Sequence, residues 1–505
     1  MKTKRSTKLF LPFLLLVSVS LACNQLTGAS VTPTQQSATE TATLIPVTEV
    51  VTTEPADPNA GASGMGDSLY PEFGNGGYNV LHYTLDITVN NVATSDLTAI
   101  TTVEAKATQA LNSFNLDFVA FDITSITVNG QPAIFERADQ ELTVTPSTPL
   151  IEDETFTVVV QYHGSPGGMQ SVALPFQTGW VTIEGGSFVL SEPDGSASYY
   201  PVNDHPLDKA SYTFRVTVPK PFDVAANGVL TETVDNGDTN TFIFEARDVM
   251  ASYLATINID ELDLETMEPA NGIPIRNYYS TGLPADVRKP FARQGEMLIY
   301  FSELFGPYPF EIYGAFVMDT EFGAALENQT MSIFGMDMID LDDVEGTELT
   351  VAHELAHQWF GDSVSVADWS DIWLNEGFAT YSEGLWIEHT DGRGALDEWV
   401  KSEYTTVTDF PEYFPPPGNP AADNLFNGGV YLRGGLTLHA LRLEVSDEVF
   451  FDILRTYAES YKYSNATTDD FIAVAEEASG KELNEFFDDW LFNEKIPPIP
   501  QMGLE

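Results

Sequence analysis

Cysteine and basic residues are scarce in this chain of 505 residues. Its one cysteine, Cys23, excludes an intramolecular disulfide. The 22 lysine and arginine residues are opposed by 75 aspartate and glutamate residues, which gives a formal net charge of −53 at pH 7. Because a surface of this sign repels nucleic acid and anionic membranes, we expect no nucleic-acid partner.

The apolar run nearest the start, Leu9 to Leu21, is too short for a comfortable membrane span. It follows a basic head and ends just before Cys23, which predicts a signal peptide over residues 1–22. A sole cysteine in this place resembles the signal of a bacterial lipoprotein. We therefore expect an exported protein that a lipid on Cys23 anchors to the membrane. Simple secretion is the alternative, because Ser20 stands where that motif prefers leucine.

The composition of the remaining chain predicts a multidomain α+β protein. Residues 23–69 are rich in Thr, Ser, Ala, Pro and Gly, which predicts a disordered tether. Residues 70–262 contain alternating apolar and polar runs between turn signals, so we expect an all-β domain, an antiparallel saddle or sandwich. Helical periodicity predominates over residues 263–495, and residues 496–505 form a tail.

The sequence His353-Glu354-Leu355-Ala356-His357 is an HExxH pattern in a stretch with helical periodicity. Positions i and i+4 share one helix face, so the two imidazoles can converge on a single ion. Glu376, after 18 intervening residues, completes a two-histidine, one-carboxylate set that leaves a fourth position open for water. Glu354 is then placed to deprotonate that water. We predict one catalytic zinc ion per chain; a buried helix with merely hydrogen-bonded histidines is the alternative.

Three residues outside this set are candidates for supporting roles. Glu383 shares a helix face with Glu376 and could accept a hydrogen bond from a ligand histidine. Glu327 follows small residues and could replace the water around a substrate ammonium, although an ordinary loop acid is the simpler interpretation. The Tyr431 phenol could donate a hydrogen bond to an oxyanion, but a single tyrosine does not by itself indicate this role.

Together these motifs resemble the aminopeptidase N family of gluzincin metallopeptidases, which also includes leukotriene hydrolase. The resemblance rests on HExxH, the 18-residue interval and Asn375-Glu376-Gly377-Phe378-Ala379. A G-A-x-E-N-like element precedes them at residues 323–328, and Val430-Tyr431-Leu432-Arg433-Gly434 follows. The resemblance runs from about residue 78 to residue 492 and includes Ser191-Glu192-Pro193.

The resemblance implies a thermolysin-like, mainly helical catalytic domain over residues 263–495. It also implies a role for each matched residue: His353, His357 and Glu376 bind zinc, Glu354 is the general base, Tyr431 stabilises the oxyanion, Glu192 and Glu327 anchor the substrate's α-amine, and the backbone of Ala324 and Ala325 pairs with the substrate. The sequence departs from the family at Ala324, where glycine is usual. It also ends where many relatives continue into a helical C-terminal domain, so we expect no such domain here.

The expected activity is zinc-dependent removal of N-terminal residues from peptides with a free amino terminus. Two alternatives stay open: an endopeptidase on the same zinc site, and a non-catalytic surface-binding lipoprotein that inherited the site. A requirement for a free amine separates the first alternative from the expected activity. The intact Glu354 and Tyr431 argue against the second.

Overall fold

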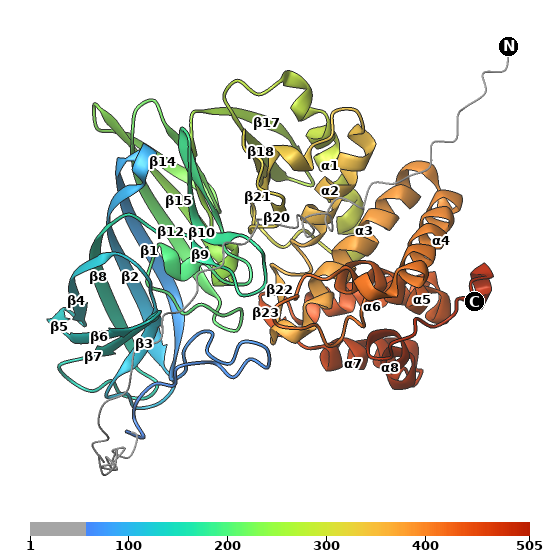
Figure 1. Ribbon diagram of the computed structural model, residues 1–505, viewed down its shortest axis with the longest axis horizontal. Coiled ribbons are helices and arrows are strands. Elements are labelled where there is room, and N and C mark those ends of the chain that lie inside the picture. Colours follow the sequence, from blue (N-terminus) through green and yellow to red (C-terminus); the bar gives the residue numbers. More distant parts are fainter. Residues whose placement is uncertain (1–56) are drawn as a thin grey trace, which may run out of the picture. The chain divides into compact units, whose positions relative to one another are not determined.

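The computed structural model describes residues 57–505. The predicted signal peptide, Cys23 and the tether up to residue 56 lie outside this range. Residues 59–505 form one unit, in which a β-rich half precedes a mainly helical half (Figure 1). Within the described range, no helix combines the length and the apolar character that crossing a bilayer requires.

The β-rich half is organised around an eight-stranded sheet. In strand β1 (Tyr78–Asn91), Leu85 and Ile87 are buried in the core while the residues between them are more exposed, as the alternation predicts. Strand β1 pairs antiparallel with β2 (Asp96–Ala107) but parallel with β12 (Ala210–Pro219). The sequence predicts antiparallel sheets, and this parallel pair differs from that prediction. The long connection between β1 and β12, which contains strands β2 to β11, allows the two strands to run in the same direction.

The order of this sheet is β14-β15-β12-β1-β2-β8-β4-β5. Its other strands are β4 (Asp122–Val128), β5 (Gln131–Pro132), β8 (Thr155–Gly164), β14 (Val229–Asp235) and β15 (Thr239–Met250). A five-stranded sheet, in the order β13-β16-β11-β10-β9, consists of Asp223–Ala226, Ile257–Asp260, Gly186–Leu190, Gln177–Ile183 and Met169–Gln170. A three-stranded sheet, in the order β3-β7-β6, consists of Phe114–Asp117, Glu141–Thr145 and Ile134–Ala138.

The helical half begins with a mixed sheet in the order β17-β18-β19-β21-β20, which leaves β20 at an edge. Its strands are Leu262–Ala270, Ile273–Ser280, Tyr313–Val317, Ser332–Phe334 and Ala325–Leu326. The α-helices of this half are α1 (Gln294–Phe305), α2 (Val344–Ala356), α3 (Trp373–Asp391), α4 (Arg393–Asp409), α5 (Gly434–Val445), α6 (Asp447–Ser460), α7 (Thr468–Ser479) and α8 (Asn484–Leu491). Strands β22 (Val364–Val366) and β23 (Ser464–Ala466) pair in parallel.

Residues 59–69 differ from the tether that their composition predicts, because hydrogen bonds tie them to the folded body. The Asp67 carboxylate accepts from the backbone N–H groups of Leu69, Tyr70 and Trp369, and it lies 3.2 Å from His205 Nε2. Its side chain is fully buried. Composition misses this segment because polar contacts with distant residues order it, rather than apolar burial of its own.

We expect Asp67→Ala to lower the free energy of unfolding by about 2–4 kcal/mol, because two buried N–H groups and a partly buried one lose their acceptor. Urea unfolding of the variant and the parent measures this difference. Glu232→Ala, which removes an exposed acid on β14, is the control and should change the free energy of unfolding little. Equal unfolding midpoints for Asp67→Ala and the control would contradict a structural role of residues 59–69.

Candidate active site

Helix α2 presents the two histidines of the HExxH pattern on one face. Its apolar residues Val351, Ala352 and Leu355 are fully buried, which fixes how the helix is rotated against the core. His353 lies in the last turn, and His357 directly follows the helix end with its N–H bonded to the His353 carbonyl. The two imidazole rings lie 4.8 Å apart, centroid to centroid.

Helix α3 brings Glu376 to these histidines. Glu376 Oε2 lies 3.4 Å from His353 Nε2 and 3.5 Å from His357 Nε2. Ligand atoms about 2.1 Å from a tetrahedral zinc ion would be separated by about 3.4 Å, so the spacing fits this metal. All three side chains are buried. The structure therefore brings together the three predicted ligands in an arrangement that can hold zinc.

Hydrogen bonds orient both histidines toward the same point. His353 Nδ1 lies 2.7 Å from Glu383 Oε1, and His357 Nδ1 lies 3.1 Å from the Phe360 carbonyl. With the proton on each Nδ1, both Nε2 lone pairs face Glu376 and are free for a metal. Glu383 thus lies where the helical spacing places it. Burial raises the pKa of Glu376, but the two histidines outweigh it and lower the value to about 2, so this carboxylate is anionic.

Glu354 lies beside the ligands with a free oxygen. Its Oε2 is buried and has no hydrogen-bond partner among the described residues. Burial raises the pKa of Glu354 to about 8, although both histidines act in the opposite direction. One oxygen or nitrogen each from Glu354, Glu327 and His357 lies within 4.8 Å of the others. A carboxylate in this setting can accept a proton from a water and later release it.

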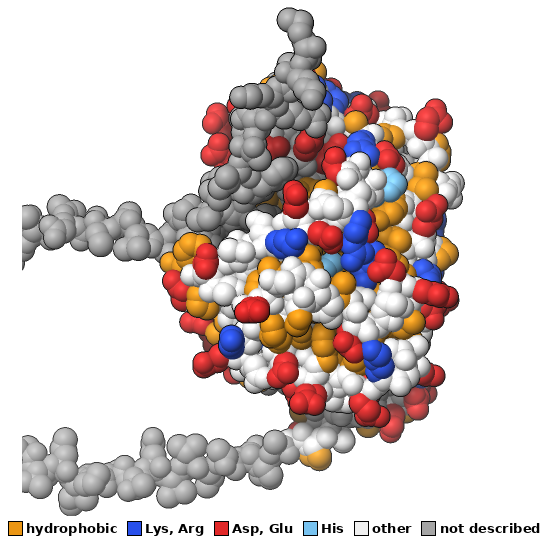
Figure 2. Space-filling model, turned by 90° about the vertical axis from the view of Figure 1, so that its right-hand side faces the viewer, with side chains coloured by type: hydrophobic (Ala, Val, Ile, Leu, Met, Phe, Trp, Pro, Cys, Tyr) orange, Lys and Arg blue, Asp and Glu red, His pale blue; other side chains and the backbone are white. Residues whose placement is uncertain are grey.

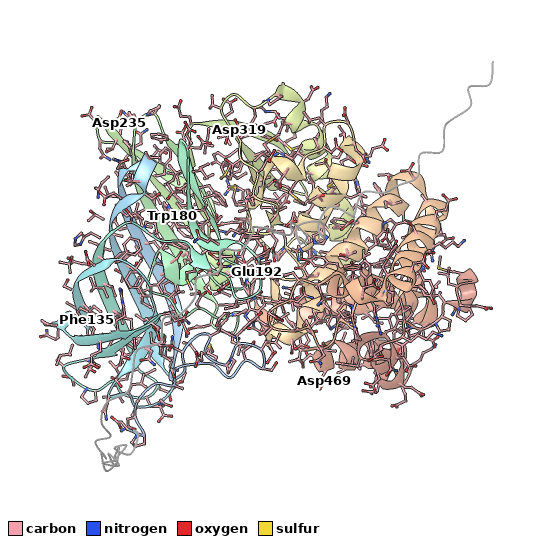
Figure 3. The ribbon with its side chains drawn as sticks, in the orientation of Figure 1. Phe135, Trp180, Glu192, Asp235, Asp319 and Asp469 are labelled. Atoms are coloured by element: carbon pink, nitrogen blue, oxygen red, sulfur yellow. The ribbon has the colours of Figure 1, made fainter. Side chains whose placement is uncertain are left out.

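Glu192 and Glu327 come from different halves of the molecule and meet near the metal ligands. Glu192 follows β11 and lies between the β-rich strands and the helices (Figure 3). Glu327 follows the edge strand β20, and the Tyr253 hydroxyl lies 3.5 Å from its Oε1. Burial, followed by the charges of Glu327 and Glu376, raises the pKa of Glu192 well above its usual range. This concentration of buried carboxylates favours a cation as their partner.

The backbone of Ala324 and Ala325 lies at an open sheet edge. Ala325 pairs with Phe334 of β21, and the Ala324 carbonyl accepts from the Gly335 N–H at 3.2 Å. Because β20 is the last strand of its sheet, its other side can pair with an extended peptide.

Tyr431 lies in a π-helical turn, Gly429–Arg433, that leads directly into helix α5. Its ring is nearly parallel to that of His353, with centroids 6.1 Å apart. Burial and then the charge of Glu376 raise the pKa of the phenol, which keeps it protonated as a donor. A π-helical turn of this kind often marks a functional site in a helix.

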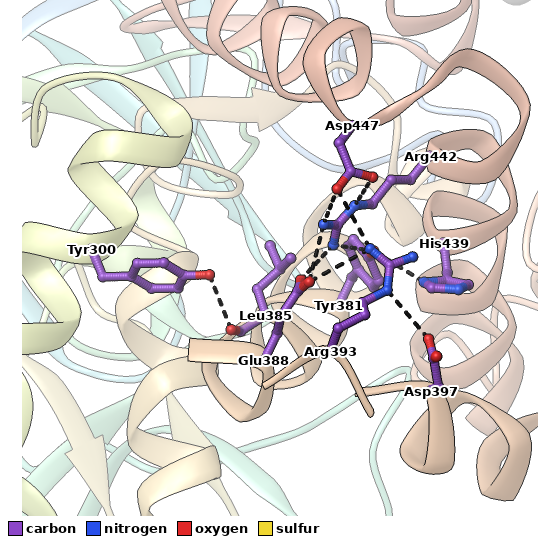
Figure 4. A network of polar contacts seen from close by, with 9 residues as sticks. All are labelled: Tyr300, Tyr381, Leu385, Glu388, Arg393, Asp397, His439, Arg442 and Asp447. Atoms are coloured by element: carbon purple, nitrogen blue, oxygen red, sulfur yellow. Dashed lines mark hydrogen bonds and ion pairs between the residues drawn. The ribbon is translucent and has the colours of Figure 1, made fainter. Parts of the chain in front are cut away.

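Two contacts hold helix α3 in place. A Cβ atom at Gly377 would lie 2.9 Å from the Gly434 backbone, so only glycine permits α3 to approach the Tyr431 turn this closely. Near the end of α3, Arg442 of α5 binds Glu388 of α3 at 2.6 Å and Asp447 of α6 at 2.8 Å (Figure 4). These contacts set the position of the helix that carries Glu376.

Two further buried polar residues near the site, Asp362 and Tyr253, belong to none of the sequence motifs. Both carboxylate oxygens of Asp362 are buried and have no hydrogen-bond partner within residues 57–505. Burial, followed by the charge of Glu327, raises the pKa of Asp362 well above its usual range. Its place five residues after His357 could have drawn attention to it. Tyr253, 74 residues before Glu327, offers no such signal, because only the fold brings the two together.

This geometry is that of a zinc metallopeptidase centre: two histidines and a glutamate able to hold the ion, a free carboxylate beside them and a phenol nearby. Residues 79–254 match the Peptidase M1 N-terminal domain, and residues 291–490 match the Peptidase family M1 domain. The chain belongs to peptidase family M1, which confirms the family resemblance, the two-domain fold and the zinc cofactor.

Solved structures of similar size support this assignment. An M1 zinc metallopeptidase from Deinococcus radiodurans is 32% identical, with a TM-score of 0.80 over 86% of this chain and 98% of that one. A two-domain M1 zinc metallopeptidase with bound L-tryptophan is 31% identical, with a TM-score of 0.80 over 86% of this chain and 99% of that one.

Curated relatives are longer. Aminopeptidase M1 of Arabidopsis thaliana is 29% identical over 61% of this chain and 37% of its own length. Probable aminopeptidase 2 of Sulfurisphaera tokodaii is 26% identical over 77% of this chain and 51% of its own length. The chain thus spans between about a third and a half of these relatives.

We expect Glu383→Ala to weaken zinc binding about 10- to 100-fold, because His353 Nδ1 loses the acceptor that orients its ring. Competition with a metal-binding dye at fixed pH measures the affinity. Glu398→Ala, which removes an exposed acid on α4, is the matched control. If both variants bind zinc as tightly as the parent, Glu383 does not support the ligand.

Proposed function

We propose that this protein is a zinc-dependent aminopeptidase that removes residues from the amino terminus of peptides. The observation that carries the proposal is the pair of buried carboxylates, Glu192 and Glu327, beside the zinc ligands. Glu192 Oε1 has no hydrogen-bond partner among the described residues. A peptide's α-ammonium is a cation small enough to enter such a site and supply the missing hydrogen bonds. An acylated terminus has no such charge and leaves the carboxylates unpaired.

Zinc held by His353, His357 and Glu376 would supply a Lewis acid that polarises the substrate carbonyl and lowers the pKa of a water molecule. Glu354 takes a proton from the water as its oxygen attacks the first peptide carbonyl carbon. The Tyr431 hydroxyl donates to the oxyanion that forms.

The breakdown of the tetrahedral intermediate uses the same groups. Glu354 returns the proton to the nitrogen of the breaking C–N bond, which releases the shortened peptide and one amino acid. Meanwhile Glu192 and Glu327 hold the α-ammonium, and the backbone at Ala324 and Ala325 aligns the chain, so that the first peptide bond is the one attacked.

Three structures of related enzymes guide the choice of substrates. Those proteins were solved with L-tryptophan, with L-arginine and with the substrate Tyr-Ser-Ala. A panel for this protein therefore includes chromogenic amides of tryptophan, tyrosine and arginine.

We expect free aminoacyl amides to be hydrolysed and their N-acetyl forms to react at least about 100-fold more slowly, because only a free amine pairs with the buried carboxylates. Steady-state assays of each pair measure the ratio. Activity should disappear on chelation and in Glu354→Gln, which loses the base but keeps the zinc ligands.

Equal rates on free and acetylated substrates would favour the endopeptidase alternative. Activity that persists in Glu354→Gln with zinc bound would contradict the mechanism. A parent protein that binds zinc and peptides but hydrolyses none would support the non-catalytic alternative.

We also propose that the protein is exported and anchored by a lipid on Cys23. The basic head, the apolar run and the sole cysteine support this proposal. We expect the parent protein in the membrane fraction of a bacterial host and Cys23→Ser outside it. Mass spectrometry of the mature N-terminus detects the lipid. A parent protein that is soluble and begins without a modified Cys23 would contradict the anchor and favour simple secretion.

A further inference from the structure

A short turn carries the carboxylate that we assign to the substrate amine. Residues 327–330 follow strand β20, and the Met331 N–H closes the turn by donating to the Asn328 carbonyl at 2.8 Å. Thr330 has φ of 67°, in the left-handed region that β-branched residues rarely adopt. Such a conformation persists only where neighbouring groups hold it, so the contacts of this turn identify what positions Glu327.

Three buried side chains hold the turn. Asn227, from the β-rich half, donates from Nδ2 to the Gln329 carbonyl at 2.8 Å. Arg276 of β18 donates from Nη1 to the Thr330 carbonyl at 3.2 Å. The third is Gln358, which is the residue directly after His357.

Gln358 bonds both ends of the turn. Its Nε2 donates to the Glu327 carbonyl at 2.9 Å, and its Oε1 accepts from the Thr330 N–H at 2.8 Å. One partner is an acceptor and the other a donor, so this position requires a side chain with both functions. The same Oε1 also accepts from the Tyr308 hydroxyl at 3.1 Å. A carboxylate would keep the bonds from Thr330 and Tyr308 but lose the bond to Glu327, and an apolar side chain would keep none of the three. The side chain is fully buried, which excludes water as a substitute.

We propose that Gln358 is a positioning residue that fixes the Glu327 carboxylate relative to the zinc ligands and thereby sets the selectivity for substrates with a free α-amine. This inference rests on the proposed function. Gln358 acts through Glu327, because its own amide is bonded to the backbone of the turn. It follows His357 in the chain, so it links the turn that binds the amine to the segment that binds the metal. A displacement of about 1 Å at such a site can reduce the rate 100-fold.

The test uses Gln358→Met, which preserves length and removes both bonds, and Gln358→Glu, which retains the acceptor. For Gln358→Met we expect kcat/KM on free aminoacyl amides to fall about 10- to 100-fold while the N-acetyl forms are little affected. The ratio of kcat/KM on free substrates to kcat/KM on acetylated substrates should therefore fall by the same factor. Gln358→Glu should lower this ratio less. Zinc content should stay at one ion per chain.

A binding measurement gives a second readout that does not depend on turnover. Calorimetry of the zinc-loaded protein in a Glu354→Gln background, which keeps the zinc ligands but lacks the base, compares the affinities for tryptophan amide and for its N-acetyl form directly. We expect Gln358→Met to weaken only the free amine. Gln294→Met is the matched control, because Gln294 is a fully buried amide that bonds Asn277 instead of the turn. It should leave both the activity ratio and the affinity ratio unchanged.

Combining Gln358→Met with Glu327→Gln tests whether the effect passes through Glu327. In that background Gln358→Met should change the ratio less than about twofold, because the carboxylate it positions is already lost. Four outcomes would each overturn the inference. The first is an undiminished effect of Gln358→Met in the Glu327→Gln background. The others are found in Gln358→Met alone: an equal fall in kcat/KM for free and acetylated substrates, loss of zinc, or an unchanged ratio of the two kcat/KM values. If Gln358→Met does not fold, the same outcomes are measured on Gln358→Glu. If the parent itself shows no preference for a free amine, the proposed function fails first and this inference with it.

Discussion

Mutual repulsion among buried carboxylates is the constraint on which this structure depends. Glu192, Glu327, Glu354, Asp362 and Glu376 are each at most 6% exposed, and they lie close enough to perturb one another's pKa. His353 and His357 offset Glu327, Glu354 and Glu376, and Lys209 offsets Asp362. Charges of one sign cannot be buried together without protons or cations. Under the proposed function, two positive groups complete the site: a metal ion between the histidines and Glu376, and the α-ammonium of the substrate near Glu192 and Glu327.

The carboxylate cluster requires both halves of the molecule. The β-rich half contributes Glu192, and it supports Glu327 through Tyr253 and through the bond from Asn227 to Gln329. The helical half contributes the HExxH segment and Glu376. The metal site is built on two helices alone, whereas the proposed amine site depends on contacts across the boundary between the halves.

Several of the few basic residues are buried or half-buried and donate hydrogen bonds to backbone carbonyls inside the molecule. Arg433, 1% exposed, donates to backbone carbonyls at the end of α8, including those of Trp490 and Glu494. Arg276 and Lys209 likewise bind carbonyls inside the molecule. Guanidinium groups suit this task because they offer several donors in a fixed plane. On the face in Figure 2, acidic side chains are spread across the surface and its rim, and their mutual repulsion disfavours aggregation.

The sequence by itself determined the metal centre and most long strands, because both are local geometry. His353 and His357 share a face wherever that segment is helical, and alternation in β1 marks its buried side whatever it pairs with. Only the tertiary structure decided that residues 59–69 join the fold, that β1 and β12 run parallel and that Tyr431 lies in a π-helical turn. It also decided that Glu192 meets Glu327, 135 positions later in the chain, and that Gln358 spans the strained turn. These features depend on contacts between distant segments, and no spacing along the chain encodes such contacts.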